Sequence, residues 1–345
     1  MMVRKTLYLL LSALTIFFGA GCTRENTPKE GSVVLTFSTG KVLTKSGVAD
    51  GDSIAFDNGK PDIFLAIANA RDEVVATYPG AKSQLLENAL PTQLAIKFTD
   101  FRDNGEYTVY AAANTNGGVL GAPADTNAWK AITRASDLDA LRFAELQGDA
   151  IPVVNSSTGR MPLSAKGILS VNENLNGHAE IELQRCLAKV AFKFKNETPD
   201  TLTLTNCRVT IREINPTQGY IFPQAVDTVG VARNLTLISS TLDPIPNGSE
   251  TGFYGDKLVF PSLAPARTIG SRYFCDISFT VGGVSKTFTD LPIHDRQSND
   301  ILSLNRNQYL QIETRINRGL NVSFNFVVHD YDWDENEVTE EIIFH

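Results

Sequence analysis

Short apolar runs with alternating or β-branched residues recur along almost the whole chain after residue 31, and turn signals separate them. The run at 32–38 reads Ser-Val-Val-Leu-Thr-Phe-Ser, and similar runs occur at 93–98, 107–113 and 308–316. Apolar positions repeating every second residue in segments of this length predict strands. The tetrapeptide Val281-Gly282-Gly283-Val284 predicts a two-residue hairpin turn. The pattern therefore predicts an all-β chain built of β-sandwiches.

The remaining strands are predicted from the same signals, with two irregularities and one helix among them. The apolar parity changes near Arg185 and again near Asn206, which predicts a bulge or bend at each place. A helix is predicted within 133–147, with Ser136 as its N-cap. The other predicted strands lie at 63–67, 73–78, 179–195 as one long strand, 201–214, 235–238, 257–260, 272–281, 284–288, 320–328 and 337–344.

The amino terminus carries the features of an export signal. Arg4 and Lys5 precede an uncharged apolar run at 6–20, which is shorter than the ~20 residues that a membrane-spanning helix needs. The run ends Gly19-Ala20-Gly21-Cys22, so we expect a lipoprotein signal at 1–21 and a lipid on Cys22. An ordinary secretory signal or an uncleaved membrane helix is the alternative. Residues 22–31 then form a polar tether.

The length of the chain and one glycine-containing interval predict two domains. A chain of 345 residues is long for a single core. Pro162, Gly167 and Gly177 lie between Arg160 and Ala179, after which the sequence restarts with a long strand. We therefore predict an N-terminal β-sandwich at 32–178 and a C-terminal β-sandwich at 179–345.

Charge and cysteine content restrict the partners and the covalent chemistry. A net charge of −8 argues against a nucleic-acid partner, because binding to phosphates needs a basic surface. With Cys22 assigned to lipid, Cys186, Cys207 and Cys275 remain, an odd number. We predict buried free thiols; a disulfide between Cys186 and Cys207 is the alternative outside the cytoplasm.

The sequence offers no catalytic motif, so we expect no enzymatic activity and no cofactor. The four histidines lie far apart, and the chain has neither a phosphate-binding glycine loop nor a nucleophile elbow. Asp330, Asp332, Asp334 and Glu341 have the spacing of a calcium loop. Glu335 stands where such a loop needs glycine, so an exposed, charged strand end is the preferred interpretation and no metal is predicted.

Four segments, in order, resemble the Bacteroidetes fimbrillin family, the subunits of type V pili. They span nearly the whole mature chain. The first is the lipoprotein terminus with 32–37 and 43–47, the second is 107–115, the third is 160–164 with 183–190, and the fourth is 305–309 followed by Trp333 before a closing strand.

The resemblance implies two transthyretin-like β-sandwich domains and assembly by strand exchange. Family members reach the outer membrane as lipoproteins, a trypsin-like protease removes the first strand, and a strand of another subunit fills the groove. The removed strand would be 32–38. Lys41 and Lys45 stand in the following loop, where stalk subunits often have arginine. A stalk or tip subunit cut after Lys45, an uncut lipidated anchor, and lysines that are only solvated charges all remain open.

The resemblance thus implies a fimbrial, surface-exposed outer-membrane protein of cell adhesion, whose partners are other pilus subunits and ligands on host or bacterial surfaces. Asp52-Ser53-Ile54 and Asp227-Thr228-Val229 are similar to O-glycosylation sites of exported proteins of this phylum, which makes Ser53 and Thr228 candidate acceptors. The alternative function is a monomeric surface lipoprotein that binds glycans by stacking sugar rings on an exposed aromatic side chain. Trp129 and Trp333 are the tryptophans available for it.

Overall fold

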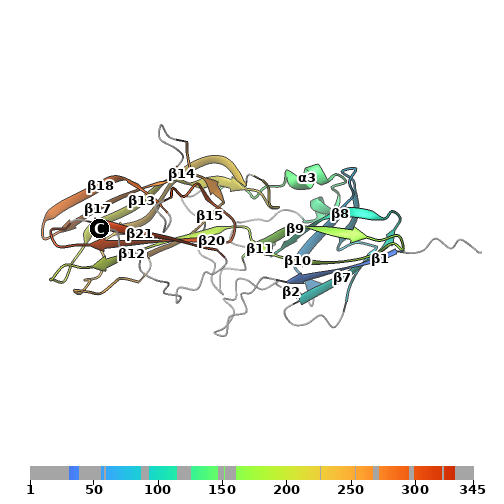
Figure 1. Cartoon of the computed structure of the whole chain (residues 1–345), viewed down its shortest axis with the longest axis horizontal. Coiled ribbons are helices and arrows are strands. Elements are labelled where there is room, and N and C mark those ends of the chain that lie inside the picture. The colour runs from blue at the N-terminus through green and yellow to red at the C-terminus, as the bar shows by residue number, and fades with distance from the viewer. Residues whose placement is uncertain are drawn as a thin grey trace, which may run out of the picture.

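The computed structural model describes residues 31–38, 56–57, 60–86, 93–114, 126–146, 151, 161–225, 227–252, 254–266, 272–294, 299–320 and 322–330. Nearly all regular elements in these ranges are strands, which confirms the all-β prediction. The molecule is elongated, with two β-rich halves lying end to end (Figure 1). None of the described helices is long and apolar enough to cross a membrane.

The N-terminal half is one curled sheet with the strand order β5-β4-β8-β9-β10-β1-β7-β6, and β11 pairs with β9 beside this path. The end strands β5 and β6 are joined by only residues 79–82, so the sheet folds back on itself as a sandwich. Its strands are β1 (Gly31–Ser38), β4 (Ile63–Ala68), β5 (Val74–Tyr78), β6 (Ser83–Leu85), β7 (Gln93–Phe101), β8 (Gly105–Ala113), β9 (Leu163–Val171), β10 (Asn176–Glu182) and β11 (Gln184–Arg185).

The C-terminal half is a sandwich of two four-stranded sheets, ordered β15-β12-β20-β21 and β14-β13-β17-β18. Their facing sides form one core, in which the ring of Phe194 lies 6.3 Å from that of Phe279. The strands are β12 (Ala188–Asn196), β13 (Thr205–Gly219), β14 (Thr228–Ser240), β15 (Tyr254–Val259), β17 (Phe274–Val281), β18 (Val284–Pro292), β20 (Gln308–Ile316) and β21 (Val322–Asp330).

Short elements complete the fold. They are the strand pairs β2 (Phe56–Asp57) with β3 (Lys60–Pro61) and β16 (Ser262–Leu263) with β19 (Ser303–Leu304), and the helices α2 (Thr126–Lys130) and α3 (Ala135–Asp139). The predicted helix at 133–147 is thus one short helix. Ser136 is not its N-cap, because the helix begins at Ala135 and Arg134 occupies the N-cap position. The backbone N–H and the hydroxyl of Ser136 both donate to the Asp72 carboxylate.

The interval between Arg160 and Ala179, where we placed the boundary between the two domains, holds β9 and the start of β10. Its glycines allow close packing between strands rather than turns. A Cβ at Gly167 would lie 2.2 Å from the Ile181 side chain, and one at Gly177 would lie 2.7 Å from the Ser170 carbonyl oxygen.

The predicted single long strand at 179–195 is wrong, because this segment holds β10 and β11 of the N-terminal sheet and β12 of a C-terminal sheet. The parity change near Arg185 marks the passage of the chain from one core to the other: Leu187 belongs to the first core and Ala188 to the second. The predicted boundary at 178/179 therefore falls within β10. The division into two domains that fold independently stays a prediction.

One predicted irregularity and the predicted hairpin turn in the C-terminal half are confirmed. The pairing of β13 with β17 shifts register between Thr205 and Arg208, and Asn206 has a positive φ of 49°. Val281 pairs with Val284 across a two-residue turn, with φ values of 54° at Gly282 and 79° at Gly283. Positive φ at both central residues is the requirement of the type I′ hairpin turn.

Candidate functional site: the groove that holds β1

β1 lies in the middle of the N-terminal sheet although it begins the described chain. It runs parallel to β10, with Ser32 opposite Asn176 and Ser38 opposite Glu182. Its other edge pairs antiparallel with β7, where Val33 is opposite Phe98. Both backbone edges of β1 are therefore occupied. We call the space between β7 and β10 the β1 groove.

The inner face of β1 is part of the N-terminal core. Val33, Leu35 and Phe37 are fully buried, and the residues between them are half-buried on the outer face. This alternation follows directly from the period-two pattern of the sequence. Burial of three such side chains contributes on the order of 5–9 kcal/mol to the stability of this half.

Loss of β1 would divide the sheet. Its removal from the strand order leaves β5-β4-β8-β9-β10 on one side and β7-β6 on the other. The facing edges of β7 and β10 would then present unpaired N–H and C=O groups above an unfilled apolar slot. An extended segment with apolar residues at alternate positions satisfies both needs, so the groove is by its geometry a receptor for a strand.

β1 runs toward the junction between the two halves. The backbone N–H of Leu183, just before β11, donates to the Ser38 carbonyl at 2.8 Å. β11 then pairs with the first residues of β9, with Gln184 opposite Ser164. The β10–β11 wall of the groove is thus continuous with the segment that leads into the C-terminal sandwich (Figure 1).

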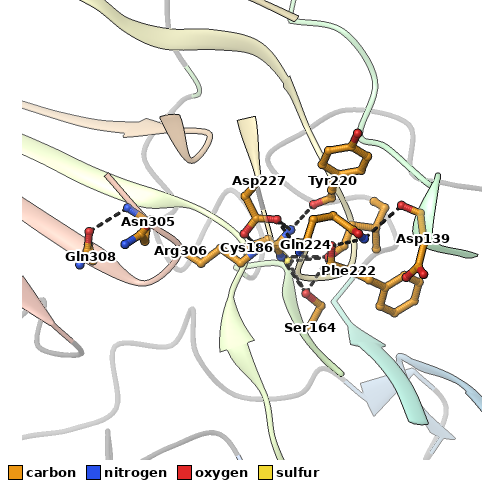
Figure 2. Close-up of polar contacts among 11 residues, drawn as sticks. Asp139, Ser164, Cys186, Tyr220, Phe222, Gln224, Asp227, Asn305, Arg306 and Gln308 are labelled. Atoms are coloured by element: carbon orange, nitrogen blue, oxygen red, sulfur yellow. Dashed lines mark hydrogen bonds and ion pairs between the residues drawn. The ribbon is translucent and has the colours of Figure 1, made fainter. Parts of the chain in front are cut away.

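A buried arginine lies at this junction, in the turn before β20. Figure 2 shows the Arg306 guanidinium surrounded by Asp227, Ser164 and the 220–222 backbone. Nε of Arg306 is 2.7 Å from an Asp227 carboxylate oxygen, and Nη1 donates to Ser164 Oγ at 2.9 Å and to the Ile221 carbonyl at 3.0 Å. Nη2 donates to the Tyr220 carbonyl and to Asp227. We call Arg306, Asp227, Ser164, Tyr220 and Ile221 the junction clamp.

The connection between β13 and β14 contributes apolar contacts to the same junction. Ile221 and Phe222 are buried in the N-terminal core although they belong to the C-terminal half of the sequence. The Phe222 ring packs edge-on against Tyr110, with ring centroids 5.1 Å apart. The two halves therefore meet through a buried aromatic contact as well as through the clamp.

The predicted modification residues mostly fall outside the described ranges. Cys22, Lys41, Lys45 and Ser53 are among these residues, so their roles stay predictions. Thr228 begins β14, where its backbone is opposite Gly219. The preceding Asp227 of the candidate glycosylation motif is engaged by Arg306.

The three cysteines within the described ranges are free and buried, as the sequence predicted. Burial raises the pKa of the Cys207 thiol to about 12, and it also raises the pKa of Cys186 and of Cys275. Cys186 borders the clamp, because its thiol donates to Ser164 Oγ at 3.2 Å. Cys186 and Cys207 belong to different cores and are not bridged.

Within the described ranges, no three His, Cys, Asp or Glu side chains lie close enough together to hold a metal ion. His178 lies 3.8 Å from the Glu180 carboxylate on β10, and His294 lies 3.1 Å from that of Asp300. These two histidines therefore lie beside different carboxylates, in different halves of the molecule. The calcium-like cluster beyond Asp330 lies outside the described residues.

Trp129 is not available for stacking on a sugar, contrary to the alternative interpretation. It is 3% exposed and packs edge-on against Phe64, with ring centroids 5.3 Å apart. No described aromatic side chain is exposed. Trp333 lies outside the described residues.

Comparison with known proteins supports the fold. No protein-family model matches the chain, and no curated protein matches it. A solved protein of Parabacteroides distasonis, provisionally described as a cell adhesion protein, is similar with a TM-score of 0.50 at 12% identity over 88% of this chain and 98% of that chain. A similarly described protein of Bacteroides eggerthii has a TM-score of 0.47 at 12% identity, over 88% of this chain and 96% of that chain.

A Bacteroides thetaiotaomicron protein, provisionally described as polysaccharide-binding, has a TM-score of 0.40 at 11% identity over 88% of this chain and 99% of that chain. At 12% identity, the similarity to the Parabacteroides protein shows the fold alone. The two-part β architecture is therefore shared over nearly the whole length of a solved protein.

Proposed function

We propose that this protein is a surface fibre subunit, or the anchor of such a fibre, that assembles by strand exchange in the β1 groove and serves in cell adhesion. The observation that carries the proposal is the place of β1, an N-terminal strand paired on both edges in the middle of a sheet. A strand at a chain terminus can leave the fold without breaking any other element, and the groove it leaves accepts a strand from another copy.

Several further observations support the proposal. The sequence segments that resemble fimbrillins run through both halves of the structure. The Parabacteroides protein with the same fold is itself provisionally described as a cell adhesion protein. The described residues form no cluster of His, Cys, Asp or Glu that could hold a metal ion. We propose a non-enzymatic role without a cofactor.

Proteolytic release of β1 is the proposed trigger of assembly. Lys41 and Lys45 follow β1 closely in the sequence, and a cut after either residue separates β1 from the rest of the chain. Treatment of the mature chain with trypsin should give SDS-resistant multimers, visible as a ladder in unheated samples and absent after boiling. A Lys41→Gln/Lys45→Gln variant is the matched control and should stay monomeric. Monomers at every concentration after complete cleavage would contradict the proposal.

The location that we propose is the outer membrane surface, with Cys22 as the lipid-bearing residue of the uncut form. Mass spectrometry of the protein recovered from its native cell surface distinguishes the two roles. A lipidated terminus at Cys22 identifies an anchor, whereas a terminus at Ser46 identifies a subunit that has lost β1. The same spectra test Ser53 and Thr228 for added hexoses.

Glycan binding by a monomeric lipoprotein is the alternative class of function. It needs a surface other than Trp129, because that ring is buried. A glycan array probed with the untreated mature chain tests it. Binding by the uncut monomer, with no multimer after cleavage, would favour this alternative over strand exchange.

A further inference from the structure

The junction clamp contacts the N-terminal sheet at the start of β9, the neighbour of the β10 wall of the β1 groove. Ser164, which accepts from Arg306, is the second residue of β9 and lies opposite Gln184 of β11. β11 follows β10 after a single residue, Leu183, whose N–H donates to the last residue of β1. The clamp therefore contacts β9 next to β11, at the end of the sheet that faces the C-terminal half.

A second contact joins the same turn of the C-terminal sandwich to β11. The Arg185 guanidinium of β11 donates to the Asn307 side-chain oxygen at 3.0 Å, and the Asn307 N–H donates to the Leu187 carbonyl at 2.9 Å. Arg306 and Asn307 are adjacent in the turn before β20, which pairs in parallel with β12. This one turn of the C-terminal sandwich thus holds both β9 and β11.

The chemistry of Arg306 suits it to this position. A guanidinium has five N–H donors in a fixed planar arrangement. All five are used, two toward Asp227, two toward the backbone carbonyls of Tyr220 and Ile221, and one toward Ser164. The side chain is 5% exposed and that of Asp227 is 17% exposed, so water replaces few of these bonds. An ammonium group has three donors without fixed planarity and cannot satisfy the same set.

We propose that Arg306 is a positioning residue that fastens β9 and β11, the strands that adjoin the β10 wall of the β1 groove, to the C-terminal sandwich. The wall then keeps its place because of contacts that do not involve β1. On the proposed function, the consequence is that the groove stays formed in the interval between the loss of β1 and the arrival of a donor strand.

Hydrogen exchange of the intact mature chain, carrying Cys22→Ser to remove the lipid site, tests the inference. In Arg306→Lys, amides of β9 and β11 should exchange at least about tenfold faster than in the parent, whereas amides of β17 and β18 keep their rates. Asp227→Asn, a milder change, should give the same pattern with a smaller increase. If Arg306→Lys does not fold, the amide exchange rates of β9 and β11 in Asp227→Asn test the inference instead.

Arg212→Lys is the matched control. Arg212 makes a two-pronged contact with Asp276 and a further bond to Asp290 on the C-terminal sandwich, away from the junction. This variant should accelerate exchange in β17 and β18 and leave β9 and β11 unchanged. An equal acceleration in both halves for Arg306→Lys, or none in β9 and β11, would overturn the inference. The measurement requires no multimer, so it remains decisive if strand exchange fails.

Discussion

The buried ion pair of Arg306 with Asp227 has a large expected effect on stability. Loss of one member of a buried pair leaves the other charge without compensation, which costs about 3–5 kcal/mol. Arg306→Ala should therefore lower the free energy of unfolding by this amount, measured by urea titration. Arg212→Ala removes a pair whose arginine side chain is 31% exposed, so we expect a loss of about 1 kcal/mol or less. Equal losses in the two variants would contradict the buried-pair argument.

The buried thiols give the protein a predicted weakness at alkaline pH. Unfolded thiols ionise near pH 8.5, whereas burial holds the pKa of Cys207 at about 12. Above about pH 8.5 the unfolded chain binds fewer protons than the folded chain. The contribution of this thiol to the free energy of unfolding is therefore fully present below this pH and is lost as the pH rises toward 12. Cys207→Ala should reduce the slope of unfolding free energy against pH in this range. An unchanged slope would show that this thiol does not carry the effect.

Residue-scale predictions from sequence succeeded where the signal was local. The apolar neighbours of Cys186 predicted a buried thiol, and the structure has one. The role of Arg306 could not be predicted, because Asp227 lies 79 positions away and Ser164 lies 142 positions away. Segments 160–164, 183–190 and 305–309, which carry the resemblance to fimbrillins, nevertheless supply Ser164, Arg185 and Arg306 to this one junction.

At the scale of elements, β1 is held by the apolar side chains on its inner face. Substitutions on its inner and outer faces should therefore differ in their cost to the free energy of unfolding. Leu35→Ala removes a fully buried side chain and should cost about 2–5 kcal/mol. Thr36→Ala, on the half-buried outer face, should change stability by about 0.5 kcal/mol or less. Urea unfolding of the uncut chain measures both. A similar cost at the two positions would show that β1 is not seated as described.

Elements were predictable from sequence where periodicity and turn chemistry agree. β20 has the predicted bounds, and the Gly282-Gly283 turn joins β17 to β18 as expected. β9 and the first residues of β10 were missed because Gly167 and Gly177 are turn signals in sequence, whereas here they allow a neighbouring side chain or carbonyl to approach the backbone. The periodicity of 179–195 could not reveal that its strands belong to different sheets.

At the scale of the whole molecule, the account depends on the pairing partners of β1. The sequence predicted β1 itself, but not its parallel pairing with β10, because strand order follows from long-range packing. The same limit applies to Ile221 and Phe222, which leave the C-terminal sandwich and enter the N-terminal core. The molecule is thus two cores joined by a clamp, with β1 lying along β10, next to the strand β9 that the clamp contacts.

The most direct test of the account is to lock β1 in its groove. Thr36 of β1 and Ala95 of β7 are directly opposite, and both are partly exposed. Opposite residues of an antiparallel pair have the spacing that a disulfide needs. The measurement is the multimer ladder of Thr36→Cys/Ala95→Cys after trypsin, with Thr36→Cys alone as the control. We predict monomers when the disulfide is formed and a ladder after reduction; a ladder of equal strength in the oxidised protein would contradict strand exchange at this groove.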